Sequence, residues 1–164
     1  INAIASKYGP FMNYYQYMNL IEEQEIENFF EQDGIKVSFV QVPKEKAVTV
    51  FVIESNHKKL IYAPCDCVPF PDEHILYDAD VMILGNTFIG NTLKEGRFVT
   101  QGHPLREELH SFEDAQNIFR RIRAKRLIIT HIEEDWGKSY DDYLEIEKGH
   151  QNVSFAYDGL SIIL

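Results

Sequence analysis

Short apolar runs that end at polar turn residues dominate most of this chain. Runs rich in β-branched and aromatic side chains, bounded by proline, glycine or asparagine, are typical of strands. The wholly apolar run Val81-Met82-Ile83-Leu84 indicates a strand that is buried on both faces. We predict strands over residues 36–42, 47–54, 59–63, 81–84, 126–130, 153–156 and 160–164, with Asp158-Gly159 as a hairpin turn between the last two.

The remaining segments show either helical spacing or the composition of loops. Ser111 is suited to cap a helix over residues 111–124, because Asp114 can complete a capping box. Helices are also predicted over residues 1–8, 20–31, 74–79 and 139–148, with Asp33-Gly34 as the stop signal of the second. Loops are predicted over the proline-rich residues 64–72 and over residues 85–104. The alternation of strands and helices indicates an α/β fold.

Composition limits the classes of protein to which the chain can belong. Its 164 residues are enough for one domain with a core, and 45% of them are hydrophobic. No run approaches the roughly 20 apolar residues that a membrane helix needs, so no membrane partner is expected. The net charge of −10 argues against nucleic acid as a partner. We assign the basic run at residues 120–126 to an exposed helix end.

The cysteines and the first residues bear on where the protein is found. Cys65 and Cys67 are too close in sequence to form an unstrained disulfide on a strand, and free thiols favour the reducing cytoplasm. No basic and apolar leader is visible at the start, so we expect a cytoplasmic protein. Because the chain begins at Ile1, we expect that it was processed or that it is part of a longer polypeptide.

Three polar residues at the ends of apolar runs are candidates for chemistry. Asp66 follows the strand predicted over residues 59–63, His131 follows the strand over 126–130, and His110 precedes the helix at Ser111. An Asp in a turn usually forms local hydrogen bonds, and a lone His after an apolar run is more often structural than a ligand. Spacing alone therefore favours structural roles.

Three sequence blocks nevertheless resemble a known family when they are taken in order. The blocks are Leu60-Ile61-Tyr62-Ala63-Pro64-Cys65-Asp66, then His110-Ser111-Phe112-Glu113-Asp114-Ala115 leading to Leu127-Ile128-Ile129-Thr130-His131, and finally Ala156-Tyr157-Asp158-Gly159-Leu160. Their order and spacing resemble the C-terminal half of the metallo-β-lactamase-fold hydrolases, most closely the branch that cleaves cyclic phosphates and other phosphodiesters. The resemblance covers about residues 36 to 164. It implies part of a four-layer αββα sandwich.

The resemblance also implies roles for individual residues. Asp66 would bridge two divalent metal ions, zinc or manganese, which would activate a hydroxide to attack a small phosphodiester or cyclic phosphate. His131 would bind one of the two metals, and a hydrogen bond from its second ring nitrogen would orient it. His110 would contact the substrate phosphate and act as a general acid. His103, in the long predicted loop, is the competing candidate for that role.

Two parts of the family's metal site are missing from this sequence. The His-x-His-x-Asp-His motif occurs nowhere, although residues 1–4 resemble the segment that often follows it. The family's middle His is also absent, and Glu45 could replace it as an oxygen ligand, although we favour a solvated turn for this glutamate. Asp66 and His131 are only two ligands, whereas a catalytic zinc usually has three from the protein. We therefore expect that the chain does not complete the site alone.

These gaps leave other functions open. The chain could be a non-catalytic or partner-dependent subunit of the same fold, or a hydrolase of thioesters or lactams. A single domain over residues 1–164, forming the C-terminal portion of a longer protein, would expose half of its core. We accordingly expect a homodimer, or a partner chain that supplies the N-terminal half. Residues of the missing motif should then be encoded upstream in the complete gene.

Overall fold

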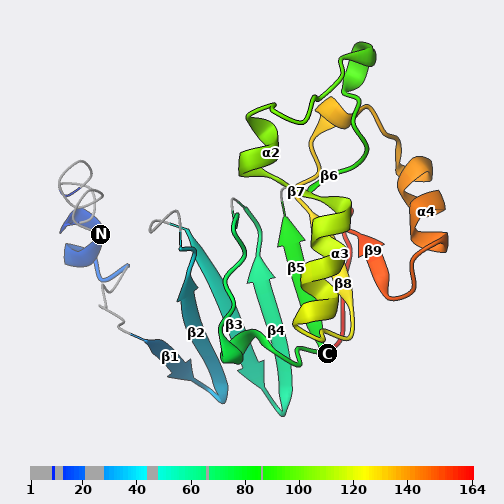
Figure 1. Cartoon of the computed structure of the whole chain (residues 1–164). Helices are drawn as coiled ribbons and strands as arrows, with labels where there is room; N and C mark the ends of the chain where they lie inside the picture. Colours follow the sequence, from blue (N-terminus) through cyan, green and yellow to red (C-terminus); the bar gives the residue numbers. More distant parts are fainter. Residues whose placement is uncertain (1–8, 10–12, 21–27, 44–47, 66, 86) are drawn as a thin grey trace.

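The computed structural model describes residues 9, 13–20, 28–43, 48–65, 67–85 and 87–164. Its centre is a mixed seven-stranded sheet with the strand order β1-β2-β3-β4-β5-β8-β9 (Figure 1). The strands of this sheet are β1 (Phe29–Gln32), β2 (Ile35–Gln41), β3 (Thr49–Ser55), β4 (Lys58–Ala63), β5 (Val81–Gly85), β8 (Leu127–Thr130) and β9 (Val153–Phe155). The helices are α2 (Leu105–Glu108), α3 (Phe112–Arg121) and α4 (Tyr140–Lys148), and the short 3-10 turns are η1 (His74–Leu76), η2 (Lys94–Gly96) and η3 (Glu134–Trp136).

The sheet has an antiparallel half and a parallel half. Strands β1 to β4 form an antiparallel meander, whereas β4, β5, β8 and β9 run parallel to their neighbours. Parallel strands need crossover connections, which here contain α3 between β5 and β8 and α4 between β8 and β9. The carboxyl ends of four neighbouring strands consequently meet at one edge of the sheet.

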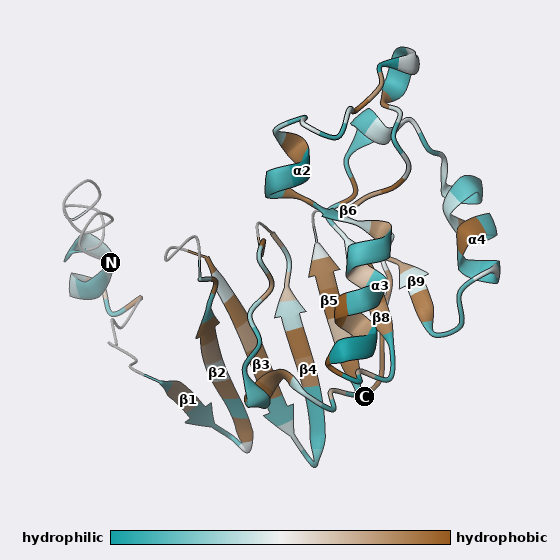
Figure 2. Ribbon diagram, in the orientation of Figure 1, coloured by the Kyte–Doolittle hydropathy of each residue, from teal (hydrophilic) through white to brown (hydrophobic). Residues whose placement is uncertain are grey.

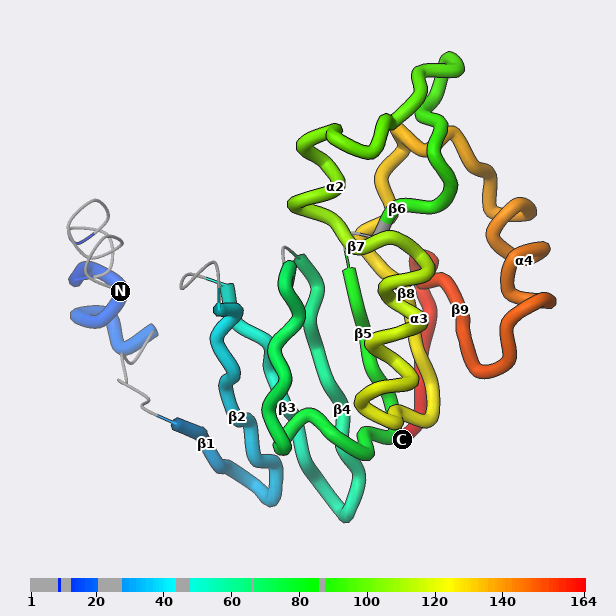
Figure 3. Tube along the Cα trace, viewed as in Figure 1, coloured from blue at the N-terminus to red at the C-terminus, as the bar shows by residue number. Residues whose placement is uncertain are grey.

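The main core lies between the sheet and a layer of helix and loop. Ala115, Ile118 and Ile122 of the α3 region pack into the same buried cluster as Val52, Ile61 and Met82 of the sheet. Residues 67–79 run down in front of β3 and β4 on this face (Figure 3), where Phe70 and Leu76 join the cluster. Ser111 and Asp114 form the predicted capping box at the start of α3.

The opposite face of the sheet is apolar but only partly covered. Figure 2 shows hydrophobic residues along the strands, and the register places Phe39, Phe51 and Tyr62 side by side on this face. The ring centroids of Phe39 and Phe51 are 5.7 Å apart, and those of Phe51 and Tyr62 are 6.3 Å apart. Tyr62 remains 39% exposed, and no described helix packs over this row. The sheet is therefore built for an apolar layer on both sides.

Two sequence predictions about secondary structure were wrong. Residues 29–31 belong to strand β1 instead of a helix, because Asp33-Gly34, with φ values of 53° and 76°, makes a tight hairpin turn to β2. Residues 160–164 form no strand. Asp158-Gly159 does make a turn, in which Leu160 N–H donates to the Tyr157 carbonyl over 3.0 Å, but β9 pairs with β8 and no hairpin forms.

Other predictions were confirmed in outline. The strands of the middle of the chain and the helices α3 and α4 lie where the sequence predicts them. Residues 74–79 contain only the turn η1, and residues 85–104 contain β6 (Thr87–Phe88) as well as η2. The helix predicted over residues 1–8 lies outside the described residues, as do residues 21–27 of the second predicted helix. No helix in the described part of the chain is both long and apolar enough to cross a membrane.

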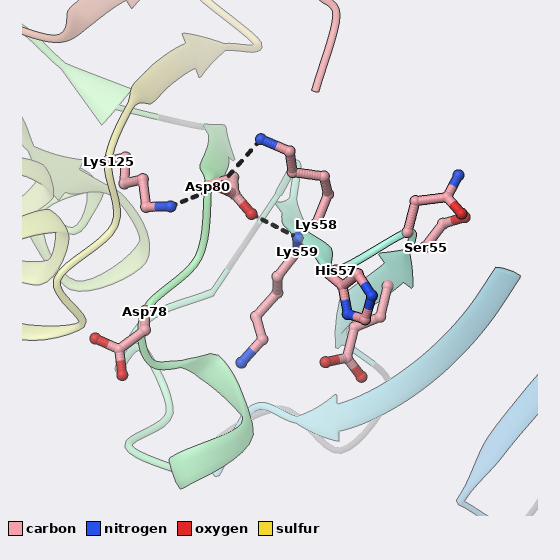
Figure 4. A pocket seen from close by; sticks show the side chains of 9 residues that line it. Ser55, His57, Lys58, Lys59, Asp78, Asp80 and Lys125 are labelled. Atoms are coloured by element: carbon pink, nitrogen blue, oxygen red, sulfur yellow. Dashed lines mark hydrogen bonds and ion pairs between the residues drawn. The ribbon is translucent and has the colours of Figure 1, made fainter.

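A network of charges holds the amino end of β5, at the edge opposite the carboxyl ends. The Asp80 carboxylate accepts hydrogen bonds from Lys59 N–H (2.9 Å) and from Lys125 Nζ (2.8 Å), as Figure 4 shows. The hydrogen bond from Lys125 is the chief reason that the pKa of Asp80 lies below its usual value, and the backbone hydrogen bond from Lys59 adds to it. These contacts join β4, β5 and the start of β8, and they pair the charge of Asp80 with that of Lys125.

Candidate functional site

The carboxyl ends of β4, β5 and β8 lie side by side. Ala63 of β4 pairs with Leu84 of β5, and Gly85 pairs with Thr130 of β8. Pro64, which follows β4, therefore lies near the residue that follows β8, which is His131. Asp66, the predicted bridging ligand, lies outside the described residues, but its neighbours Cys65 and Cys67 are described.

His131 is placed against the segment that carries Asp66. Its Nδ1 lies 3.3 Å from the carbonyl oxygen of Pro64, and 46% of its side chain is exposed. In the tautomer with the proton on Nδ1, the ring donates to Pro64 and leaves a lone pair on Nε2. This is the orienting hydrogen bond that the sequence analysis predicted for a metal-binding His.

The backbone at His131 has an uncommon conformation. Its φ is 51°, in the left-handed region that residues other than glycine seldom occupy. Such conformations cost of the order of 1–3 kcal/mol and cluster at functional sites. Glu133 Oε1 also lies 3.6 Å from Nε2, a contact that the sequence analysis did not predict.

His110 approaches the same segment from the other side. Strand β7 (His110–Ser111) pairs with β6, and this pairing places His110 opposite Thr87, two residues beyond the end of β5. The His110 side chain is buried, and its Nε2 lies 3.0 Å from the carbonyl oxygen of Cys67. Burial is the main reason that the pKa of His110 lies below its usual value, so the ring is neutral at pH 7.

A second apolar cluster borders this edge of the sheet, and we call it the edge cluster. It contains the buried residues Phe88, Val99, Leu109 and Trp136. The rings of Phe88 and Trp136 are 5.7 Å apart, and an ion pair between Lys94 and Glu134 joins η2 to η3. The long predicted loop thus packs against residues near His110 and His131 in sequence, namely Leu109 and Trp136, above the carboxyl ends of the strands (Figure 1).

His103 has a local role in this structure. Its Nδ1 accepts a hydrogen bond of 3.3 Å from Leu105 N–H at the start of α2. Among the described contacts, none joins His103 to His110 or His131, whereas His110 and His131 both contact carbonyl groups of the stretch that follows β4. Glu45 lies outside the described residues.

Gly85 is a site residue that the sequence analysis did not single out. A Cβ at this position would lie 1.6 Å from the carbonyl oxygen of Pro64, so only glycine allows β5 and the segment 64–67 to approach so closely. A glycine that ends a fully apolar strand was the available signal. The same Pro64 carbonyl lies next to His131 Nδ1, so Gly85 sets the position of that contact.

The described side chains do not complete a metal site. Within the described ranges, no group of three or more His, Cys, Asp or Glu side chains is arranged to hold a metal ion. His131 could supply one ligand nitrogen, and with Asp66 the chain would offer two ligands, fewer than the three of a usual catalytic zinc.

Solved structures share this architecture. Zn²⁺-bound PqqB from Methylobacterium extorquens superposes with a TM-score of 0.64 at 21% sequence identity, covering 89% of this chain and 54% of PqqB. YhfI from Bacillus subtilis, a metallo-β-lactamase fold protein, gives 0.58 at 14% identity over 90% of this chain and 60% of YhfI. A diphosphatase from the PhnP family gives 0.60 at 17% identity over 90% of this chain and 51% of its own.

This chain has the metallo-β-lactamase fold. It spans between 51% and 60% of the length of these three proteins. No family model matches its sequence, and no curated protein matches it significantly. At these identities the likeness concerns the fold, and it confirms the α/β class and the sandwich architecture expected from the sequence.

The close approach at Gly85 predicts a sharp effect of adding one methyl group. In this metallo-β-lactamase fold, Gly85→Ala would push the Pro64 carbonyl away from β5 and should lower the free energy of unfolding by at least about 2 kcal/mol. Gly102→Ala is the matched control, because a Cβ there meets no atom within 4 Å. Urea denaturation followed by circular dichroism measures both. Equal stability of the two variants would contradict the described packing.

Burial of neutral His110 predicts a pH dependence of stability. Because the folded pKa lies below the unfolded value near 6.5, the unfolded chain takes up a proton first as the pH falls. The contribution of His110 to the free energy of unfolding is therefore present above the unfolded pKa and is lost as the pH falls below it. Between about pH 7.5 and about pH 5.5, the melting temperature of the wild type should fall more than that of His110→Gln. Identical slopes would show that the ring is not buried in its neutral form.

Proposed function

We propose that the complete protein is a metal-dependent hydrolase that acts on a small phosphodiester or a cyclic phosphate. One observation carries the proposal: His131 and His110 contact the residues on either side of Asp66. His131 Nδ1 is 3.3 Å from the carbonyl oxygen of Pro64, and His110 Nε2 is 3.0 Å from that of Cys67. The two imidazoles thus contact carbonyl groups that precede and follow a carboxylate residue in sequence, next to the carboxyl ends of parallel strands, a frequent location for active sites in α/β sheets.

Each of these residues has a proposed role. Asp66 and His131 would hold the metal ions, together with ligands from outside this chain's described residues. Bound divalent ions would supply a water of lowered pKa as the nucleophile. A hydrogen bond from Nδ1–H to the Pro64 carbonyl would leave the lone pair of His131 on Nε2, where it could bind a metal ion.

We propose two roles for His110. Its Nε2–H donates to the carbonyl of Cys67, the residue that follows Asp66 in sequence. When Nδ1 also carries a proton taken up from water, the ring would contact the substrate phosphate and pass that Nδ1 proton to the leaving oxygen, and it would return to its neutral form. The diphosphatase of the PhnP family has the same fold, which is consistent with a phosphorus-containing substrate.

Hydrolysis of a generic diester tests this proposal. The complete protein, supplied with zinc or manganese, should hydrolyse bis(p-nitrophenyl) phosphate, and His131→Ala and Asp66→Asn should each lower kcat/KM by at least about 100-fold. His74→Ala is the matched control, because His74 is exposed in η1 at the far side of the molecule from β8's carboxyl end. A loss of the same size in all three variants would contradict a site at Asp66.

The partly covered face of the sheet supports a further part of the proposal. The row Phe39, Phe51 and Tyr62 lies on a face that no described helix covers, and this chain spans little more than half of PqqB. We propose that a second β-sheet packs on this face, from the rest of a longer polypeptide or from another chain. Sheets that pack face to face bury such rows of large side chains.

Self-association of the chain as given checks this idea. With the apolar row exposed, the chain should form dimers or larger assemblies at micromolar concentration, and Phe51→Glu should shift it toward monomer in analytical ultracentrifugation. Phe98→Glu is the control, because Phe98 is 64% exposed and lies outside the sheet. A wild-type chain that stays monomeric, or an equal response to both changes, would contradict the proposed interface.

A further inference from the structure

A cavity of about 480 Å³ lies beside His110, which forms part of its lining. Val68, Pro69 and Phe70 form an apolar part of its wall. Another part of the wall comes from α2, β7 and α3, and it carries Arg106, Arg121 and Asn117. The size suits a small organic ligand.

Arg106 is held rigidly at this cavity. Its Nε donates to the Thr100 carbonyl (2.9 Å), and one terminal nitrogen donates to the Val99 carbonyl (2.9 Å) and to Asn91 Oδ1 (2.5 Å). Its guanidinium also stacks over Phe88, 5.0 Å from the ring centroid. Among the described hydrogen bonds, none uses the second terminal nitrogen of Arg106. A fixed guanidinium with donors left over is suited to bind an anion.

Arg121 is held much more loosely. Its closest partners are the Phe70 carbonyl at 3.5 Å and Asp72 Oδ1 at 3.6 Å, and 42% of its side chain is exposed. The Arg121 guanidinium can therefore turn toward a ligand at little cost. Asn117 accepts from Arg120 through its Oδ1 (2.7 Å), which leaves its amide N–H groups as donors.

The charge of the cavity favours an anion. Its one lining carboxylate, Asp114, accepts from Ser111 N–H (3.1 Å) and Ser111 Oγ (2.5 Å) at the start of α3. The cavity lining therefore holds two arginines and one carboxylate that is already hydrogen-bonded to the helix start, while Asp72, outside the lining, lies 3.6 Å from Arg121. A lining with more arginines than carboxylates attracts anions from solution.

We propose that this cavity binds an anionic group, a phosphate or a carboxylate, between Arg106 and Arg121. The group belongs either to the far end of the substrate or to a separate small effector. If the anionic group is part of the substrate, the inference rests on the proposed function, because His110 forms part of both the cavity wall and the proposed site. If it is a separate effector, the inference is independent of the proposed function, since the cavity requires no metal.

Binding of inorganic phosphate to the metal-free chain tests the site directly. In the presence of EDTA, phosphate should shift the NMR signals of Arg121 Nε–H and of the Val68 and Asn117 amides in a saturable way. Arg121→Gln should weaken binding at least fivefold, and the loose contacts of Arg121 mean that this change should not unfold the chain. Arg97→Gln, which removes the same charge from a side chain that is 78% exposed, should change binding less than twofold.

Two results would overturn the proposal. Phosphate could fail to shift these signals at tens of millimolar, or Arg97→Gln could weaken binding as much as Arg121→Gln, which would indicate nonspecific attraction. Saturable binding without any diester hydrolysis by the holoenzyme would refute the proposed function and leave the anion site standing.

Kinetics of the holoenzyme separate the two sources of the anion. If the anion is part of the substrate, Arg121→Gln should raise KM for a phosphodiester that carries a second phosphate and leave KM unchanged for the same diester without it. If the anion is an effector, free phosphate should alter the hydrolysis of both substrates equally, and Arg121→Gln should abolish that response.

Discussion

The contact between the Pro64 carbonyl and Gly85 is the constraint on which the candidate site depends. It lets the segment after β4 turn directly across the end of β5, where a side chain of any size would block it. Because β8 runs parallel to β5, the first residue after β8 arrives at the same carbonyl, and His131 contacts it. The pairing of β6 with β7 then brings His110 to the other end of this turn. Backbone geometry, more than side-chain packing, gathers these groups.

The two edges of the sheet differ in the interactions of their polar groups. At the amino end of β5, the Asp80 carboxylate accepts hydrogen bonds from a lysine side chain and a backbone N–H. At the carboxyl end, the His131 side chain is 46% exposed and its backbone has a φ of 51°, and the edge cluster includes Trp136, five residues further along the chain. One edge thus has an acidic group with several hydrogen bonds, and the other has the candidate site residues.

Much of the fold could be predicted from the sequence because local patterns agreed with the final structure. The residues of β5 are all apolar or glycine, and the capping box at Ser111 needs only Ser111 and Asp114, so both features can be predicted from neighbouring residues alone. The errors arose where one signal has two outcomes: Asp33-Gly34 can end a helix or turn a hairpin, and here pairing with β2 decides. The parallel pairing of β9 with β8 likewise depends on partners distant in sequence.

The candidate site was predictable only in part. The resemblance pointed to His110 and His131, and in the structure these two side chains contact the carbonyl groups of Cys67 and Pro64, respectively. The role of Gly85 could not be read from the sequence, since it depends on a carbonyl 21 residues earlier that only the folded sheet brings close. The contact of Glu133 with His131 could not be predicted either, because a run of acidic residues such as 133–135 is also typical of a solvated turn.

Paramagnetic Mn²⁺ added to the isotope-labelled chain tests the central claim, that the metal-binding groups meet at the carboxyl ends of β4 and β8. The signals of His131, Cys65 and Cys67 should broaden at the lowest Mn²⁺ concentration, while those of His57 and Asp80, at the opposite edge, stay sharp. Broadening of His57 and Asp80 at the same or lower Mn²⁺ concentration than His131 would contradict the account.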